Sequence, residues 1–441
     1  MSFDLDTTEL ANEVLAAATA DELEPVMAKL VKSQALVLAR GVRNHSLFMP
    51  QLDRSVAHIA KVLGMRDRPT PKSNDNVVVL ATQIYAIGGH TKVMGDISRL
   101  VGADKVTVIL TDIYRNTPTR SVLKSDLPAL GFHCRAFLLL KSGNAVDRTV
   151  ELYGILAAIR PTRILLLSHH MDVCAVAGAW PFRDITDFLH HADSLPCLGA
   201  SLPWSSHADL TFNCHISCRK AGLPAEYVSM ALPKPPAIER PPNRGAGLLF
   251  ATCGHPGKYQ HPARHRWTDW AVACLREPDA SIVHIGPADD AFRAEVHGAL
   301  AGAEIDPGRY DFVGTKPNLT AELLSRGVDI YLGSYPEGGG RANLEAMAVR
   351  IPVIHTTMPD PEPLMYFANP LPSWVRVTDP GEMPAAIAAC RRLQLEMAEP
   401  SYAAQLEEEL GRFEAFLAGN PVPTIDPKSV FGATLYATSS S

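Results

Sequence analysis

Short apolar runs alternate with helix-like segments along most of the chain, and this alternation limits the fold more than any other feature of the sequence. Continuous apolar runs of four to eight residues are typical of buried strands, whereas spacings of three and four residues indicate helices. The segment Val146–Ile159 shows the second pattern, with Val146, Val150, Tyr153 and Ala157 on one face. Strands that alternate with helices predict crossover connections and a parallel sheet covered on both faces. The sequence therefore predicts an α/β protein.

The alternation occurs twice. The first series has predicted strands at residues 76–80, 106–110, 136–140, 164–168, 188–191, 210–213 and 227–232. The second series has predicted strands at residues 247–253, 281–286, 310–314, 329–333 and 352–356. Its predicted helices lie at residues 265–276, 291–300, 319–326 and 342–349, and a helical region follows from 380 to about 418.

A proline-rich stretch separates the two series. Between residues 233 and 242, five of ten residues are proline. Proline has no backbone N–H to donate and is unfavourable inside helices, so we expect a stiff connector. The predicted domains are therefore residues 71–240 and 245–420, with a helical extension at 1–70 and a tail at 421–441. In open α/β sheets ligands bind beyond the carboxyl ends of the strands, so chemistry is expected in the loops there.

The N-terminal extension reads as helical. Thr19 and Glu22 form a capping-box pattern, but Pro25 leaves open whether the helix begins there instead. Two roles stay open for residues 1–66, namely association into a homo-oligomer and docking of a protein acceptor.

Charge and composition exclude several classes of protein. The 41 basic and 47 acidic residues give a net charge of −6, so no chain-wide positive field favours nucleic acid, and we predict no nucleic-acid partner. The N-terminus is acidic and lacks the order of a signal peptide, and no apolar run approaches the ~20 residues of a membrane span. Eight scattered cysteines favour reduced thiols. We therefore expect a cytoplasmic protein without a transmembrane segment.

The most informative motif is a glycine triplet between a predicted strand and a predicted helix. Gly338, Gly339 and Gly340 allow backbone N–H groups to approach a ligand, and the helix start that follows favours an anion such as a diphosphate. Glu337 precedes the triplet and Glu345 falls in the first predicted turn; such carboxylates can accept hydrogen bonds from sugar hydroxyls. The alternative is that Glu345 only complements the helix dipole and the glycines only form a turn.

This Glu-x7-Glu arrangement, which continues as Leu-Glu-Ala-Met-Ala and a Pro-Val-Ile strand, resembles the donor motif of retaining GT-B glycosyltransferases. The resemblance implies two Rossmann-like domains and a nucleoside diphosphate sugar as co-substrate, with no further cofactor. It implies that Glu337 contacts the sugar and Glu345 holds the ribose. It also places backbone at Thr315 and Lys316, after Phe312-Val313-Gly314, near the base, whose identity stays open.

A lysine ends the loop after the first predicted strand of the second domain. Lys258 resembles the basic motif of the family and is expected to neutralise the diphosphate, although the usual arginine a few residues earlier is missing and Arg341 is its candidate substitute. The alternative is a solvated loop lysine. With Trp267 and Trp270, this stretch also resembles, more faintly, the O-GlcNAc transferase class, whose members invert configuration.

Two features of the first domain match the family in outline. Gly88 and Gly89 follow its first strand, where the resemblance implies a loop that faces the donor; the neighbouring His90 has the alternative of only capping the turn. A histidine and an aspartate at a strand end suit either removal of the acceptor proton, with the carboxylate orienting the imidazole, or recognition of a hydroxyl. The resemblance makes His191 the best match to a strand-end histidine that contacts the donor sugar, with Asp193 as the orienting carboxylate. The alternative is that these histidines are only structural. His170 and Asp172 are the reserve candidates.

The many histidines between residues 169 and 215 also suggest a metal. GT-B enzymes generally need no catalytic metal, and the helically spaced pair His261 and His265 encloses Pro262, which disfavours a ligand helix. Cys214 and Cys218 lack a second pair at zinc-finger spacing. We therefore predict no metal.

Together these patterns predict a glycosyltransferase. It is expected to move a sugar from a nucleoside diphosphate sugar to a hydroxyl of a glycan, small molecule or protein, with retention of configuration. Three alternatives stay open: a nucleotide-sugar 2-epimerase of the same fold, a pyridoxal-phosphate-dependent glycan phosphorylase, and a non-catalytic sugar- or protein-binding descendant.

Overall fold

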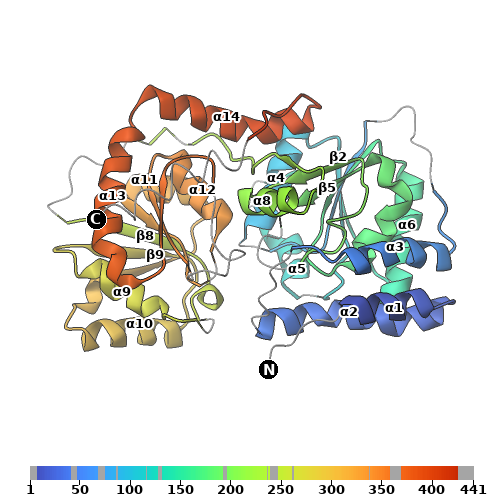
Figure 1. Cartoon of the computed structure of the whole chain (residues 1–441), viewed down its shortest axis with the longest axis horizontal. Helices are drawn as coiled ribbons and strands as arrows, with labels where there is room; N and C mark the ends of the chain where they lie inside the picture. The colour runs from blue at the N-terminus through green and yellow to red at the C-terminus, as the bar shows by residue number, and fades with distance from the viewer. Residues whose placement is uncertain are drawn as a thin grey trace. The chain divides into compact units, whose positions relative to one another are not determined.

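The structure is a computed structural model, and it describes residues 7–40, 47–67, 75–85, 88–115, 117–127, 132–191, 196–235, 237–238, 247–260, 263–336, 338–357 and 369–425. The chain divides into two compact units. The first holds residues 1–231 and 413–422, and the second holds residues 232–412 and 423–441. Each unit is built around its own sheet with helices packed on it (Figure 1).

The first unit contains a seven-stranded parallel sheet in the order β3-β2-β1-β4-β5-β6-β7. Its strands are β1 (Val77–Ala81), β2 (Val106–Leu110), β3 (Ala136–Leu139), β4 (Arg163–Leu167), β5 (Thr186–His190), β6 (Ser206–Asp209) and β7 (Glu226–Tyr227). Its helices are α1 (Thr7–Ala16), α2 (Ala20–Arg40), α3 (Pro50–Val62), α4 (Gly89–Val101), α5 (Thr117–Ser121), α6 (Ala145–Ile159), α7 (Val173–Ala179) and α8 (Phe212–Lys220).

The second unit contains a six-stranded parallel sheet in the order β10-β9-β8-β11-β12-β13. Its strands are β8 (Leu249–Cys253), β9 (Ser281–Ile285), β10 (Tyr310–Gly314), β11 (Ile330–Leu332), β12 (Val353–Thr356) and β13 (Trp374–Val377). Its helices are α9 (Trp267–Leu275), α10 (Asp290–Gly302), α11 (Leu319–Arg326), α12 (Gly340–Ala348) and α13 (Met383–Glu396), and α14 (Pro400–Leu417) runs from this unit into residues of the first.

The two parallel sheets confirm the predicted α/β fold class. The central strands are mostly apolar and buried, as in β2 apart from Thr107 and β4 after Arg163, because helices cover both faces of a parallel sheet. Asn144 caps the start of α6 by accepting a hydrogen bond from the backbone N–H of Asp147, and Arg160 ends this helix in the left-handed conformation. Local sequence therefore accounts for where this helix begins and ends.

Two predictions about strands were wrong, and one strand was missed. Residues 210–213 are not a strand, because β6 ends at Asp209 and the Thr211 side chain caps α8 by accepting from the N–H of Cys214 at 3.2 Å. The strand expected at 227–232 is only Glu226–Tyr227. β13 was not predicted; it is a short strand at the edge of its sheet.

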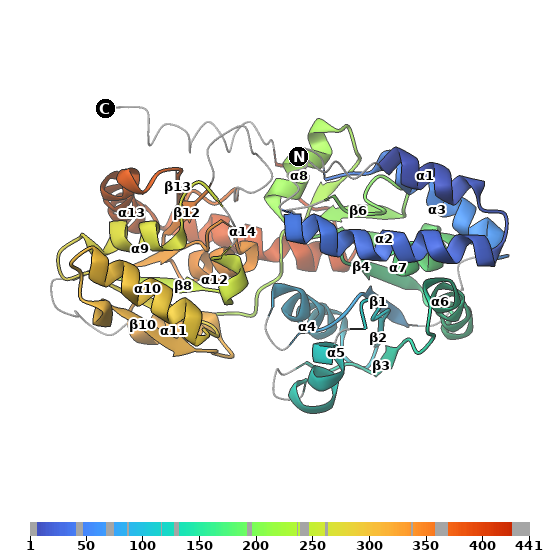
Figure 2. The same cartoon turned by 90° about the horizontal axis from the view of Figure 1, so that it is seen from below.

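The N-terminal helices belong to the first unit. Thr19 and Glu22 form the predicted capping box at the start of α2, and Pro25 lies inside this helix. Glu24 of α2 accepts hydrogen bonds from the first N–H groups of α6, and Asp53 of α3 accepts from the N–H groups of Gly199 and Ser201. Burial raises the pKa of Asp53 to about 6. α2 and α3 pack against α7 (Figure 2), so the apolar faces of these helices contribute to the core of this unit.

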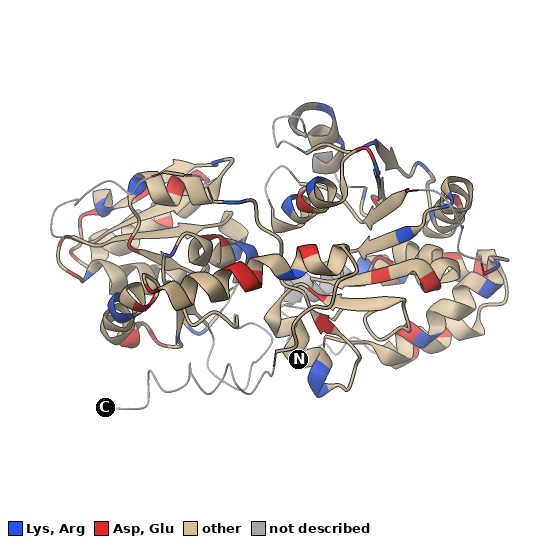
Figure 3. Ribbon diagram, turned by 90° about the horizontal axis from the view of Figure 1, so that it is seen from above, with Lys and Arg blue, Asp and Glu red and all other residues tan. Residues whose placement is uncertain are grey.

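Charged residues of both signs are interspersed along the elements of both units (Figure 3). Among the helices of the described residues, none has the length and apolar composition that crossing a bilayer requires.

Candidate functional site

Each sheet has a point where the chain reverses its direction of winding. β1 lies between β2 and β4, and β8 lies between β9 and β11. At such a point the loops after the two central strands diverge to opposite faces and leave a crevice beyond their carboxyl ends, which is where ligands of open α/β sheets bind. Each sheet therefore has one expected site, next to β1 and β4 in the first unit and next to β8 and β11 in the second.

In the second unit, the loops after β8 and β11 meet. The loop after β8 contains a short turn at Pro256–Lys258, capped by the His255 imidazole, which accepts from the N–H of Gly257 at 3.0 Å. The Lys258 ammonium donates to the carbonyl oxygen of Gly338 at 3.4 Å. The lysine and the glycine loop predicted to share one site therefore lie together.

The glycine loop lies close to two side chains. A Cβ on Gly338 would lie 3.0 Å from Cε1 of His355 in β12, which is a tight contact, and a Cβ on Gly339 would lie at the ordinary contact distance of 3.6 Å from the Lys258 ammonium. Gly339 is the N-cap residue of α12 and has no side chain to cap the first turn. The first N–H groups of α12 therefore lie near a cation, an arrangement that suits an anion.

Arg341 and Glu345 form a buried ion pair on α12. The Arg341 Nε donates to Glu345 Oε1 at 2.9 Å, and both side chains are buried. Because α12 begins at Gly340, Glu345 lies in its second turn. The prediction that Glu345 lies in the first turn was therefore wrong. Arg341 thus holds the carboxylate that the family resemblance assigns to the ribose.

Thr315 and Glu337 were also predicted to belong to the donor site of this unit. Thr315 is exposed and follows β10, which is separated from β8 by β9. Glu337 lies outside the described residues, as does Asp193 of the first unit.

Sequence reasoning missed Asn343. It is fully buried in α12, and neither atom of its amide has a hydrogen-bond partner within the described part of the chain. Such a group costs about 1–3 kcal/mol unless something pairs with it. No sequence signal marked it, because it lies inside the apolar stripe of its helix.

In the first unit, three histidines from separate strand ends gather beyond the carboxyl edge of the sheet. His90 lies in the first turn of α4 after β1, His169 follows β4, and His191 follows β5. His90 Nδ1 lies 3.2 Å from His191 Nε2, and the His90 and His169 rings stack with centroids 4.6 Å apart. The predicted Gly88 precedes α4 with φ of 156°, and Gly89 is its first residue. The structure thus brings His191 together with the predicted glycine loop.

These imidazoles are neutral. Burial, with the neighbouring His169, lowers the pKa of His191 to about 3, against the weaker opposing effect of the Leu189 carbonyl. Burial lowers the pKa of His169 to about 4 and that of His90 well below its ordinary value. A neutral imidazole carries one donor and one acceptor, which matches a sugar hydroxyl.

The reserve candidates differ from each other. Asp172 caps α7 and accepts hydrogen bonds from the hydroxyls of Thr82 and Thr111 at 2.6 and 2.5 Å, so its oxygens serve the fold. His170 has two buried ring nitrogens that find no hydrogen-bond partner among the described residues.

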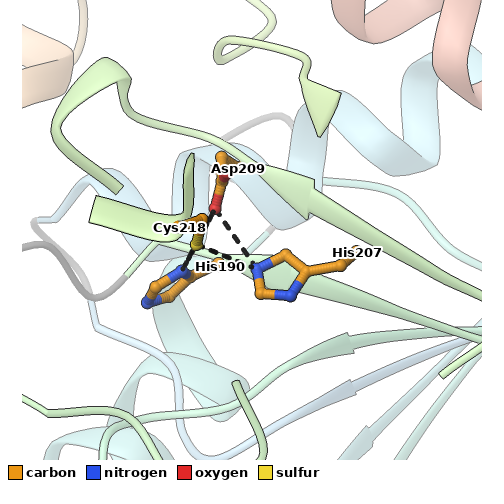
Figure 4. Close-up of side chains that lie close together, drawn as sticks. All are labelled: His190, His207, Asp209 and Cys218. Carbon is orange, nitrogen blue, oxygen red and sulfur yellow. Dashed lines mark hydrogen bonds and ion pairs between the residues drawn. The ribbon is translucent and has the colours of Figure 1, made fainter. Parts of the chain in front are cut away.

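Four other side chains of this unit form a compact cluster of metal-ligating atoms. His190, His207, Asp209 and Cys218 are all buried, and one ligand atom from each lies within 4.8 Å of the others (Figure 4). The sequence analysis considered the histidines of this region and Cys218 as metal ligands but predicted no metal, and it did not consider Asp209.

The fold is similar to those of solved glycosyltransferases. The structure of HepE from Anabaena in complex with UDP has a TM-score of 0.54 and 13% sequence identity, and the match covers 78% of this chain and 95% of that chain. The lipopolysaccharide outer core galactosyltransferase WaaB gives 0.51 and 15%, with coverage of 77% and 95%. A glycosyltransferase from Rickettsia africae gives 0.52 and 10%, with coverage of 79% and 94%.

No protein-family model matches the sequence, and a search of curated protein sequences finds no match. The structural matches cover nearly the whole of the solved chains and establish the fold. The prediction of two Rossmann-like domains, as in GT-B glycosyltransferases, is therefore confirmed.

Proposed function

We propose that this protein is a glycosyltransferase that moves a sugar from a nucleoside diphosphate sugar to a hydroxyl-bearing acceptor. The observation that carries the proposal is the meeting of Lys258 with the glycine loop and the start of α12, beyond the ends of β8 and β11. A cation beside the N–H groups of a helix start, at the winding reversal of an α/β sheet, suits a diphosphate.

In this proposal the second unit lowers the barrier by stabilising the leaving group. As the bond between sugar and diphosphate breaks, negative charge grows on the diphosphate. Lys258 and the first N–H groups of α12 stabilise that charge without rearranging. Glu345, held by Arg341, accepts hydrogen bonds from the ribose hydroxyls.

The first unit supplies hydroxyl recognition. With a pKa of about 3, His191 is a weak base, so its neutral ring suits a hydrogen bond to a sugar hydroxyl better than removal of the acceptor proton. This supports the part of the prediction in which His191 contacts the donor sugar.

The nucleotide and the stereochemistry are also proposed. HepE was solved with UDP and with UDP-glucose, so we propose a uracil nucleotide as the first donor to test. We propose retention of configuration on the basis of the Glu-x7-Glu spacing, with Glu337 as the residue that contacts the sugar.

Thermal unfolding with a panel of UDP, GDP, dTDP and CMP sugars tests donor binding. A donor at about 100 times its dissociation constant stabilises the protein by ~2.7 kcal/mol, which raises Tm. Glu345→Gln keeps an acceptor for Arg341 but removes the charge, so we expect a smaller shift. Glu322→Gln is the matched control, because Glu322 likewise pairs with an arginine one helical turn away, Arg326 on α11, and should leave the shift unchanged. A Tm that no nucleotide sugar raises would contradict the proposal.

Product analysis distinguishes transfer from epimerisation. With the donor identified above, a library of hydroxyl-bearing acceptors should yield a glycosylated product together with free nucleoside diphosphate. Conversion of the donor to its 2-epimer without any acceptor would instead support the epimerase alternative.

A further inference from the structure

The geometry of the first sheet places three polar side chains on one face. In the parallel pair β5–β6, His190 is the register partner of Asp209, so their side chains point to the same side. His207 lies two residues before Asp209 on β6 and therefore shares that side. Two imidazoles and a carboxylate thus face one point at the carboxyl edge of the sheet.

α8 supplies the fourth group. This helix follows β6, and Cys218 lies in its last turns with its sulfur among the other three side chains (Figure 4). Cys218 Sγ lies 3.2 Å from Asp209 Oδ1, 3.5 Å from His190 Nδ1 and 3.6 Å from His207 Nε2. Asp209 Oδ1 lies 3.1 Å from His190 Nδ1 and 3.2 Å from His207 Nε2.

Hydrogen bonds alone explain this arrangement poorly. His190 Nδ1 and the Cys218 thiol both form hydrogen bonds with the single oxygen Oδ1, which has about two lone-pair sites, and His207 Nε2 lies 3.2 Å from the same oxygen. The other oxygen, Oδ2, has no hydrogen bond to any described residue, and His215 Nδ1 lies 3.4 Å from it. Such crowding of one oxygen is unusual, because the polar atoms of buried groups are normally each paired.

We propose that these four side chains bind a structural zinc ion. The ligand atoms of a tetrahedral zinc site, with bonds of about 2.0–2.3 Å, are separated by about 3.3–3.8 Å. The five separations given above, from 3.1 to 3.6 Å, are close to that range. The proposed ligand atoms are His190 Nδ1, His207 Nε2, Asp209 Oδ1 and Cys218 Sγ.

Charge and burial point to the same ion. A carboxylate and a thiolate carry two negative charges and the two imidazoles are neutral ligands, so a divalent cation makes the buried group neutral. Mixed nitrogen, sulfur and oxygen ligands in a tetrahedral set favour zinc. Since all four protein ligands are buried and fill the four positions, the ion has a structural role and no open position for catalysis.

The proposed ion would join β5, β6 and α8 at one point. Because His190 is a ligand and His191 is the next residue, the zinc would also fix the backbone that carries His191. This proposal departs from the prediction of a metal-free protein. The sequence did not reveal the site, because its four ligands come from three elements and their spacing along the chain matches no known metal-binding motif.

Metal analysis of the full-length protein tests the proposal. We expect about one zinc ion per chain after purification or after incubation with zinc and removal of the excess. Replacement by Co²⁺ should give the intense visible bands of a tetrahedral site together with a thiolate-to-cobalt charge-transfer band. Absence of stoichiometric zinc, or a cobalt spectrum without the thiolate band, would overturn the proposal, and both readouts use the unmutated chain.

A variant pair locates the ion. Cys218→Ser removes the thiolate and should reduce the zinc content to well below one per chain. Cys214→Ser is the matched control, because Cys214 is also buried and lies one turn earlier on α8 but outside the cluster, so its zinc content should not change. Retention of zinc by Cys218→Ser would show that the metal binds elsewhere and would overturn the assignment.

Discussion

The carboxyl edges of the two sheets share a topology but differ in chemistry. In both units the first strand lies between the second and the fourth, so both have their expected ligand site at the same topological position. At the first edge, three imidazoles held neutral by burial gather: His90, His169 and His191. At the second, Lys258 and the start of α12 adjoin the glycine loop.

In the proposed function, this difference lets one scaffold serve two kinds of ligand. The fold fixes where a ligand can bind, but the strand-end residues decide which charge is favoured. Neutral imidazoles suit hydroxyl groups, whereas a lysine beside the N–H groups of a helix start suits a diphosphate. We therefore expect substitutions at the two edges to affect different steps.

The largest effect is expected at the first edge. His191→Ala should lower kcat for sugar transfer by about 100-fold, because hydrogen bonds to sugar hydroxyls that strengthen in the transition state contribute several kcal/mol, and it should leave the affinity for free nucleoside diphosphate unchanged. Steady-state kinetics and calorimetric titration measure the two quantities. Weaker nucleotide binding in this variant would break the division of roles between the units.

At the second edge, Lys258→Ala should raise the Kd for the nucleoside diphosphate by about 10- to 100-fold, because a charge-assisted hydrogen bond is worth ~1.5–3 kcal/mol. Raised ionic strength should weaken nucleoside diphosphate binding by the unmutated protein more than binding by the variant. Lys316→Ala is a control on the same unit, since this lysine lies near Glu322 and should change Kd little. If Lys258→Ala binds the nucleoside diphosphate as tightly as the unmutated protein does, the proposed role of Lys258 is wrong.

The smallest effect concerns pH and stability. Folding lowers the pKa of His191 to about 3 and of His169 to about 4, from 6.5. Stability from these groups is complete above pH 6.5 and is lost as the pH falls toward 4, because only the unfolded chain takes up protons there. The slope is at most ~1.4 kcal/mol per pH unit for each histidine.

The measurement is denaturant unfolding at several pH values between 6.5 and 5. Asp53, with its pKa raised to about 6, acts in the opposite direction, so the difference between His191→Gln and the unmutated protein is the informative quantity. In His191→Gln, the slope of the free energy of unfolding against pH should correspond to uptake of about one proton fewer than in the unmutated protein. Lys258→Ala should leave this slope unchanged. An unchanged slope in His191→Gln would show that the ring of His191 takes up protons in the folded protein as it does in the unfolded chain.

Much of the fold was predictable because its elements carry local signals. The strands at 106–110 and 310–314 and the helix at 319–326 have the predicted bounds, since an apolar run or a capped amphipathic pattern marks each one. α7 was not predicted, because it is buried along its whole length and has no polar face to produce a helical period. The short edge strand β13 had no clear signal either.

The sequence by itself determined the two α/β series, the glycine motif before α12 and the residue types available at the strand ends, because these depend on neighbours within a few positions. Only the tertiary structure decided that Lys258 reaches Gly338, that His90, His169 and His191 gather at one edge, and that His190, His207, Asp209 and Cys218 meet. The reason is physical: strand register and helix packing bring these residues together across long separations in sequence, and no local pattern encodes that proximity.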